Sequence, residues 1–178
     1  MPRTWLTSDH HFGHTNIIKY CKRPFVDANH MDGVLLRKWN ERVASDDEVL
    51  HLGDFSFHVP YYSSDIYNKL NGNKSLVIGN HDVTSSRMHR IGFTKVDCHK
   101  RVSGEHRWIY LCHDPYHYHH KHKAEDVELV LNGHVHEKWK VNKINGMWHI
   151  NVGVDVWDFY PVSLEEVLAL YDKTKSRP

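Results

Sequence analysis

The residues around position 80 carry three different metal-ligand groups in succession. Residues 76–78 are branched and apolar, which predicts a short buried strand, and Gly79 then allows a sharp turn into Asn80, His81 and Asp82. Consecutive strand residues point to opposite faces of a sheet, so only an irregular loop can direct an amide, an imidazole and a carboxylate to one point. These groups coordinate divalent metal ions. We therefore expect a metal-binding loop directly after a central strand.

The same arrangement occurs at four other places in the chain. In each, a short apolar run ends in aspartate or histidine, and α/β proteins carry their chemistry in loops at the carboxyl ends of strands. Residues 5–8 precede Asp9, His10 and His11, and residues 49–52 precede Gly53 and Asp54. Residues 109–112 precede His113 and Asp114, and residues 129–132 precede Gly133, His134, Val135 and His136. Together the five loops offer enough ligands for two ions.

The segments between the early runs predict the elements that hold these loops in place. Asp27 can cap a helix whose apolar residues follow three- and four-residue spacing from Met31 to Trp39. An aromatic-rich loop is expected over residues 55–64, followed by a short helix over residues 65–70. These helices would pack on the sheet that carries the loops.

The second half of the chain predicts hairpins and a closing helix. Two strands are expected to meet at residues 103–104, and residues 145–146 are Asn-Gly, a strong signal for a two-residue hairpin turn. Ser163 and Glu166 form a capping-box pattern before an apolar helix. Alternating strands and helices followed by hairpins predict an α/β fold with two stacked sheets between helical layers.

The ordered motifs resemble the signature of the calcineurin-like metallophosphoesterases. The motifs are Asp9-x-His11, Gly53-Asp54, Gly79-Asn80-His81-Asp82, His113 and Gly133-His134-x-His136. Their order and spacing match from residue 4 to residue 136, and residues 23–25 and 151–155 also resemble small bacterial and phage members. The resemblance covers the whole chain and implies one phosphoesterase domain over residues 1–178. It also implies a four-layer α/β/β/α sandwich of two mixed β-sheets flanked by helices, with the metals at one sheet edge.

The resemblance further implies two divalent metal ions and their ligands. Asp54 matches the bridging position, which suits a carboxylate because two cations about 3.5–4 Å apart repel each other. Asp9, His11 and His136 would complete the first site, and Asn80, His113 and His134 the second. Because imidazoles predominate in this set, Mn is favoured over Mg, with Fe, Zn, Ni and Co as alternatives. A hydroxide bridging the two ions would then attack the phosphorus atom in line.

His81 follows a ligand position, and the resemblance implies that it is the general acid for the leaving oxygen, oriented by Asp82. The alternative is a histidine that only positions the phosphate, and we favour the acid. For His14 and Arg23, a contact with the substrate phosphate competes with a surface role, and for Arg23 the surface role is favoured. His10 is expected to face solvent or to support the site.

Other polar residues near the motifs also have more than one interpretation. Asp114 and Asp155 either support ligand histidines or form turns. His51 is expected to pack within its strand, and His58 either faces the active cleft or is exposed. The histidine-rich run over residues 117–122 is interpreted as a solvated loop rather than a separate metal site, although the chain is enriched in histidine, with 18 in all.

Composition limits the class of protein. The chain has 178 residues, and its 23 basic and 22 acidic side chains leave a net charge of +1, so nothing in the charge calls for nucleic acid or an anionic membrane as partner. No apolar run approaches the roughly 20 residues of a membrane span, and no signal peptide is expected. Three scattered cysteines without CxxC spacing argue against a disulfide framework and favour a reducing cytoplasm.

Three functions compete on this sequence. The favoured one is a metal-dependent phosphoesterase for a small phosphorylated substrate, a diester or nucleotide rather than a phosphoprotein, because the site is expected to lack a cap. A nuclease would want a basic, aromatic-lined surface, which the balanced charge does not indicate. A catalytically silent binding scaffold on the same fold is the third, and the presence of every motif residue argues against it.

Overall fold

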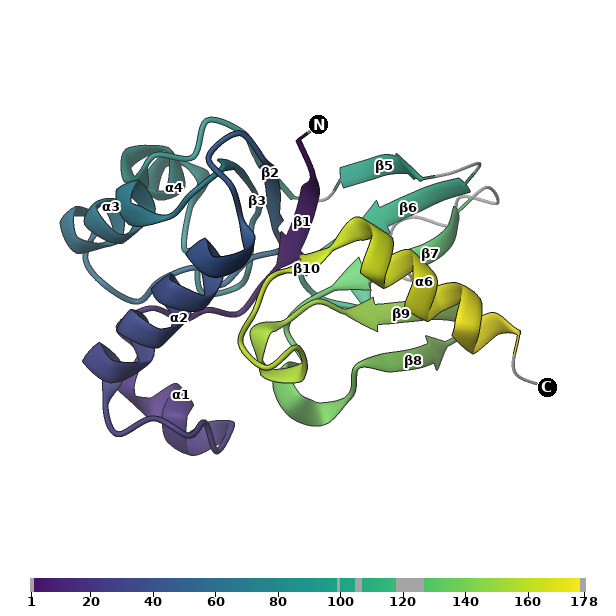
Figure 1. The fold of residues 1–178 in the computed structure, drawn as a ribbon, viewed down its shortest axis with the longest axis horizontal. Helices are drawn as coiled ribbons and strands as arrows, with labels where there is room; N and C mark the ends of the chain where they lie inside the picture. Colours follow the sequence, from purple (N-terminus) through teal and green to yellow (C-terminus); the bar gives the residue numbers. More distant parts are fainter. Residues whose placement is uncertain (1, 99, 105–106, 118–126, 177–178) are drawn as a thin grey trace.

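Two β-sheets lie face to face in the molecule, and α1 to α4 lie together beside the first of them (Figure 1). The computed structural model describes residues 2–98, 100–104, 107–117 and 127–176, with the backbone alone for residues 101–104 and 107. Both sheets mix parallel and antiparallel pairs. Two mixed sheets flanked by helices are the predicted architecture, and the prediction is confirmed.

The first sheet has the strand order β10-β1-β2-β3-β4. Four strands run parallel, and β10 pairs with β1 in the antiparallel sense. The strands are β1 (Thr4–Thr7), β2 (Glu48–His51), β3 (Asn73–Val77), β4 (Val96–Asp97) and β10 (Val162–Ser163). Parallel neighbours need long crossover connections, which here contain α1 (Thr15–Tyr20), α2 (Ala28–Arg42), α3 (Pro60–Lys69) and α4 (Ser85–Ile91).

Helix α2 covers the outer face of this sheet as its sequence spacing predicts. The Asp27 side chain accepts a hydrogen bond of 2.8 Å from the amide of His30 and so caps the helix. Met31, Leu35 and Trp39 are fully buried and share one apolar cluster with residues of β1, β2 and β3. Burial of three large side chains on one helical stripe fixes the helix against the sheet.

The second sheet has the order β5-β6-β7-β9-β8. Its strands are β5 (Lys100–Gly104), β6 (Arg107–Leu111), β7 (Val127–Asn132), β8 (Val141–Ile144) and β9 (Met147–Asn151). Short 3-10 turns follow at His136–Lys138 and Val154–Val156. In β6 and β7, alternate residues join different clusters: Ile109 and Leu129 face the first sheet, whereas Tyr110 and Val130 belong to a separate cluster.

Helix α6 (Leu164–Lys175) closes the chain and packs into the cluster between the sheets through Val167 and Tyr171. Ser163 and Glu166 form the predicted capping box, because each side chain accepts a hydrogen bond from the other residue's amide. Among the described residues, none of the helices combines the length and the apolar character needed to cross a lipid bilayer.

Several predicted elements need correction. Helix α3 begins at Pro60 and not at residue 65, because proline suits the first turn of a helix and extends it into the expected aromatic loop. Helices α1 and α4 were not predicted, although the Thr84 side chain caps α4. Strands β5 and β6 pair antiparallel as expected, but the predicted turn at residues 103–104 is wrong, because Ser103 and Gly104 pair with β6 as the last residues of β5. Residues 105–106 lie outside the described part. The turn at residues 145–146 is confirmed between β8 and β9.

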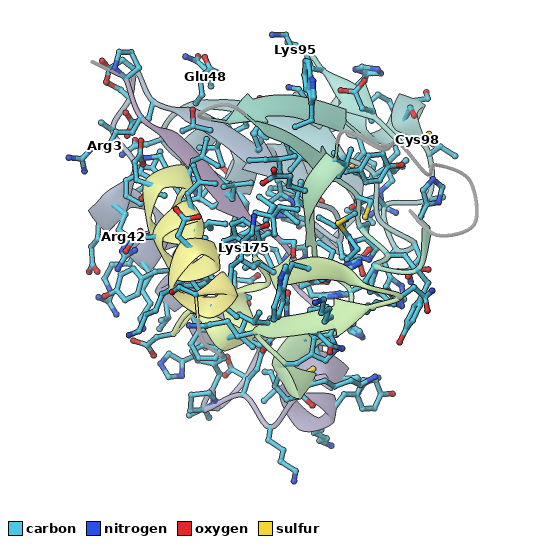
Figure 2. The ribbon with its side chains drawn as sticks, turned by 90° about the vertical axis from the view of Figure 1, so that its right-hand side faces the viewer. Arg3, Arg42, Glu48, Lys95, Cys98 and Lys175 are labelled. Atoms are coloured by element: carbon cyan, nitrogen blue, oxygen red, sulfur yellow. The ribbon has the colours of Figure 1, made fainter. Side chains whose placement is uncertain are left out.

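The parallel strands give the molecule two distinct edges. Figure 2 shows Arg3, Glu48 and Lys95 along one edge, at the amino ends of β1, β2 and β4. The carboxyl ends of these strands lie at the opposite edge, where the loops with the predicted ligands begin.

Candidate metal centre

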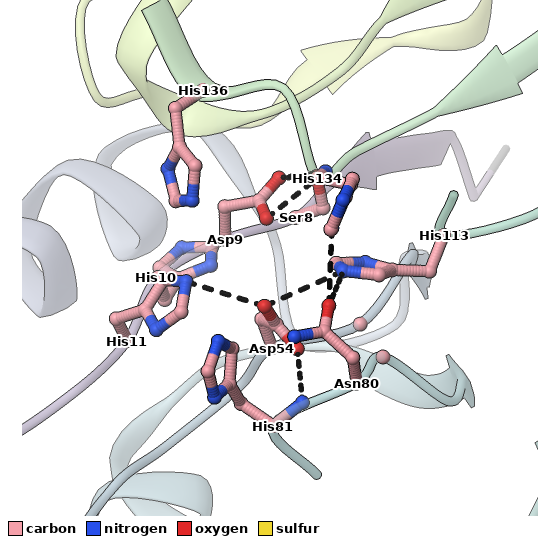
Figure 3. A network of polar contacts seen from close by, with 12 residues as sticks. Ser8, Asp9, His10, His11, Asp54, Asn80, His81, His113, His134 and His136 are labelled. Atoms are coloured by element: carbon pink, nitrogen blue, oxygen red, sulfur yellow. Dashed lines mark hydrogen bonds and ion pairs between the residues drawn. The ribbon is translucent and has the colours of Figure 1, made fainter. Parts of the chain in front are cut away.

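The predicted ligands gather in loops that follow β1, β2, β3, β6 and β7 (Figure 3). Most of these loops leave their strands through left-handed backbone, which non-glycine residues adopt rarely and at a cost of about 1 kcal/mol or more. The residues with positive φ are Asp9, His11, Asp54, His134 and His136, at 59°, 52°, 58°, 70° and 49°. Irregular backbone is what allows successive side chains to point at one centre.

Two glycines permit the close approach of these loops. A Cβ atom at Gly79 would overlap the carboxylate of Asp54. A Cβ atom at Gly133 would overlap the hydroxyl of Ser8 and the carboxylate of Asp9. Any side chain at either position would therefore displace a carboxylate that faces the centre.

The first cluster consists of Asp9, His11 and His136, whose ligand atoms lie within 4.8 Å of one another. Ser8, which the sequence did not single out, donates a 2.5 Å hydrogen bond to Asp9 Oδ2 and holds that carboxylate. His136 Nδ1 lies 3.1 Å from Asp155 Oδ2, which leaves Nε2 of this imidazole for an ion. Asp155 is thus the partner of a ligand histidine, one of its two expected roles.

The second cluster consists of Asn80, His113 and His134. Asn80 Oδ1 lies 2.9 Å from His113 Nε2 and 3.0 Å from His134 Nδ1. His113 Nδ1 donates to the carbonyl of Leu52 at 2.7 Å, so Nε2 faces the cluster. Asp114 instead accepts a bond from the amide of Tyr116 and forms a turn.

Asp54 lies between the two clusters. Its Oδ2 atom is 3.4 Å from His11 Nε2 and 3.3 Å from His113 Nε2. Asp9, Asp54 and His113 also lie close enough together to hold one ion. These residues fit divalent cations, because both ring nitrogens of His11 are buried without a hydrogen bond, and such nitrogens need a partner.

The electrostatics of the site separate its histidines into two groups. Burial, opposed in part by Asp54, lowers the pKa of His11 to about 2, and burial with the charge of His113 lowers the pKa of His134. Burial also disfavours charged His113, but the hydrogen bond to Asp54 and the charge of Asp9 outweigh it and raise the pKa to about 9. Neutral imidazoles are the form that binds metal.

The carboxylates account for the raised values. Burial opposes the charged form of His136, yet its hydrogen bond to Asp155 and the charge of Asp9 raise its pKa. Burial likewise opposes ionised Asp54, but the hydrogen bond and charge of His113 hold its pKa below the usual range. The carboxylates of the site therefore stabilise positive charge near them, as a site that binds cations requires.

Asp82 differs from its predicted role. Its buried carboxylate accepts hydrogen bonds from the amides of Gly79, Asp54 and Phe55 at 2.7, 2.9 and 2.9 Å. These bonds join the loop after β3 to the loop after β2, so Asp82 positions Asp54. In the described structure the carboxylate binds these backbone amides and not the His81 ring.

His81 and His14 both lie beside the centre. The ring of His81 is exposed, and its centroid is 5.4 Å from that of His11 and 6.5 Å from that of His14. The amide of His81 donates to Asp54 Oδ1 at 2.9 Å. An exposed imidazole tied by its backbone to Asp54 can reach an atom bound at the centre.

Arg23 is buried, which corrects both interpretations of this residue. Its guanidinium binds Asp155 through two 2.8 Å bonds and donates to the carbonyls of Asp9 and His10 at 2.7 and 3.0 Å. The residue as a whole is only 4% exposed. With its donors committed, Arg23 supports the first loop and neither lies on the surface nor faces a phosphate.

A further group of Cys21, His136 and Asp155 also has ligand-like spacing, which the sequence did not suggest. Both carboxylate oxygens of Asp155 bind Arg23, however. Burial, with the charge of Asp155, raises the pKa of the Cys21 thiol to about 12. This group therefore combines a protonated thiol with a carboxylate that Arg23 already neutralises. The two clusters described above offer better ligands for an ion.

His10 and His51 form a buried pair behind the centre. The amide of Gly53 donates to His51 Nδ1 at 3.1 Å, so neutral His51 carries its proton on Nε2 and donates to His10 Nδ1, 3.0 Å away. Burial lowers the pKa of both imidazoles, that of His51 to about 3. The expected packing of His51 is confirmed, whereas a solvent-facing His10 is wrong because its side chain is fully buried.

The pair connects the loop of Asp9 to the loop of Asp54, and its loss should weaken the fold. We expect His51→Leu to lower the free energy of unfolding by about 1–3 kcal/mol, because Gly53 and His10 each lose a buried partner. Urea unfolding of the chelator-treated protein measures this. His30→Leu, which removes an exposed contact, is the control and should change little. Equal urea midpoints of unfolding for wild type and His51→Leu would show that the pair does not stabilise the fold.

Two remaining predictions concern His58 and the histidine-rich run over residues 117–122. His58 pairs with Asp32 at 2.9 Å and is half-buried, so it faces α2 and not the centre. Of the histidine-rich run, residues 118–122 lie outside the described part. A cavity of about 310 Å³ opens beside the second cluster and is lined in part by Ile78, Cys98 and His117.

Comparisons with known proteins agree with this fold. A family model described as the calcineurin-like phosphoesterase superfamily domain matches residues 6–160. Uncharacterized protein MJ1445 of Methanocaldococcus jannaschii is 32% identical over 180 residues, which cover 98% of this chain and 94% of the relative. Gene 66 protein of Mycobacterium phage L5 is 27% identical over 188 residues, with 88% of each chain covered.

A solved structure extends the likeness to three dimensions. The protein of unknown function AQ665 from Aquifex aeolicus aligns with a TM-score of 0.76 at 26% identity, covering 96% of this chain and 100% of that one. The family model over residues 6–160 places this fold and its loops in the class of hydrolases that act on phosphoric esters. The chain belongs to the calcineurin-like phosphoesterase superfamily.

Proposed function

We propose that the chain hydrolyses phosphate esters, a diester or nucleotide in preference to a phosphoprotein, with two divalent transition-metal ions in the clusters described above. The observation that carries the proposal is the position of Asp54, within 3.4 Å of an imidazole of each cluster. Asp9, His11 and His136 would hold one ion, and Asn80, His113 and His134 the other. When bound, the ions would activate a water molecule and bind the phosphate oxygens.

The chain's own residues would orient and complete the reaction. Asp155 and the carbonyl of Leu52 fix the rings of His136 and His113 so that one nitrogen of each faces the centre. His81 is exposed at the same centre and would donate a proton to the leaving oxygen. Asn80 and His134 are exposed as well, which leaves room for a second ester group and supports the diester preference.

The identity of the metal provides the first test. After chelation, Mn²⁺ should restore phosphodiester hydrolysis more strongly than Mg²⁺ at equal free concentration, because four of the seven proposed ligands are histidines. Initial rates against mono- and diester panels measure this. Equal rescue by Mg²⁺ would contradict the ligand set. Metal binding without hydrolysis of any ester would instead favour the binding scaffold.

A further inference from the structure

Phe57 is an exposed aromatic side chain at the rim of the metal centre. It lies three residues after Asp54 and exposes 41% of its surface. Its ring stacks on His14 with centroids 3.8 Å apart and an interplanar angle of 16°. The centroids of His81 and His11 lie 4.9 and 5.5 Å away. A single exposed aromatic is ordinary, but one surrounded by three imidazoles of a candidate active site is not.

Hydrogen bonds hold the backbone that carries this ring. The amide of Phe57 donates to the carbonyl of Phe12 at 2.8 Å, and Phe12 donates to Phe55 at 3.0 Å, so the segment pairs with the loop after β1. Arg87 donates to the carbonyl of His58, the next residue, at 2.6 Å. Because its backbone is held and its ring already stacks on His14, Phe57 loses little further conformational entropy when a ligand packs on it.

We propose that Phe57 is the binding subsite for a planar aromatic group carried by the substrate, namely the base of a small nucleoside phosphate ester. The proposal rests on the proposed function and names its substrate class. A phosphate at the centre would place its ester group against the exposed rim beside His81, and stacking is the interaction that an aromatic ring offers there. The net charge of +1 favours a mononucleotide over a polymer.

Two substrates that differ only in the base test the subsite. Adenosine 5′-(methyl phosphate) carries the base, and 1-O-methylribose 5-(methyl phosphate) carries a methoxy group in its place, with the same scissile ester in both. We expect the Mn²⁺-loaded wild type to prefer the adenosine ester about ten-fold in kcat/KM, mainly through KM, because stacking acts equally in ground and transition states.

Variants of Phe57 should change this ratio. Phe57→Leu should bring it close to one, whereas Phe57→Trp should keep it, because leucine is apolar but cannot stack. Tyr61→Leu is the matched control, since Tyr61 is 78% exposed and its ring pairs with Tyr62 and not with a site histidine. Saturation-transfer NMR on the chelator-treated protein gives an independent measurement: the base protons of the adenosine ester should receive saturation in wild type and lose it in Phe57→Leu.

The outcomes separate the subsite from the function. Hydrolysis of both esters with equal kcat/KM, or a preference that Phe57→Leu retains, would overturn the subsite and leave the phosphoesterase intact. Hydrolysis of neither ester, nor of any other in the panel, would overturn the proposed function itself. A single-stranded oligonucleotide cleaved more efficiently than the adenosine ester would overturn the assignment to a small nucleotide.

Discussion

Asp54→Ala is expected to remove both metal ions and to reduce phosphoesterase activity about 10³-fold or more, a loss of ~4 kcal/mol in transition-state stabilisation. Asp54 Oδ2 is 3.4 Å from His11 Nε2 and 3.3 Å from His113 Nε2, so one carboxylate faces both clusters. Two divalent ions in neighbouring clusters would repel each other strongly, and an anion shared between them would stabilise the pair. Without it, neither cluster should keep its ion after gel filtration.

The measurement is metal content per chain after reconstitution. Wild type should hold close to two equivalents and Asp54→Ala close to none. Asp65→Ala is the matched control, because Asp65 is an exposed carboxylate paired with Lys69 on α3 and should leave the metal content unchanged. Circular dichroism establishes that the variant is folded. Saturation of wild type at one equivalent, or two equivalents in Asp54→Ala, would refute the shared site.

His81→Ala should lower activity about 10²–10⁴-fold on esters with poor leaving groups, the range typical of a lost general acid. An alkoxide or nucleoside oxygen needs a proton as it departs, whereas an activated nitrophenolate hardly does. The ring of His81 is exposed and its centroid is 5.4 Å from that of His11, so it can reach a leaving oxygen without binding a metal. Nitrophenyl esters should therefore lose far less activity.

The comparison of leaving groups decides between the two roles of His81. Equal losses on alkyl and nitrophenyl esters would mean that His81 binds phosphate rather than donating a proton. A fall in metal content would mean that it is a ligand. His89→Ala, an exposed histidine on α4, controls for the removal of an imidazole in general and should change neither quantity.

The sequence by itself determined which apolar runs end in polar loops and which chemical types those loops carry. Asp9, Asp54 and Asn80 each follow an apolar run, and the parallel strands of one sheet place their carboxyl ends at the same edge. The capping box at Ser163 and the turn at residues 145–146 were predictable because the interactions that form them are local.

Only the tertiary structure decided what lies behind and around that edge. Arg23 is 132 positions from Asp155 and His10 is 41 from His51, so these pairs leave no trace in local spacing. Asp82 binds the amides of another loop, 27 and 28 positions away, instead of the ring of its neighbour. Periodicity reports which face of an element is apolar, but partners far apart in the sequence are chosen by packing, because a buried polar group needs whichever partner the fold brings within reach.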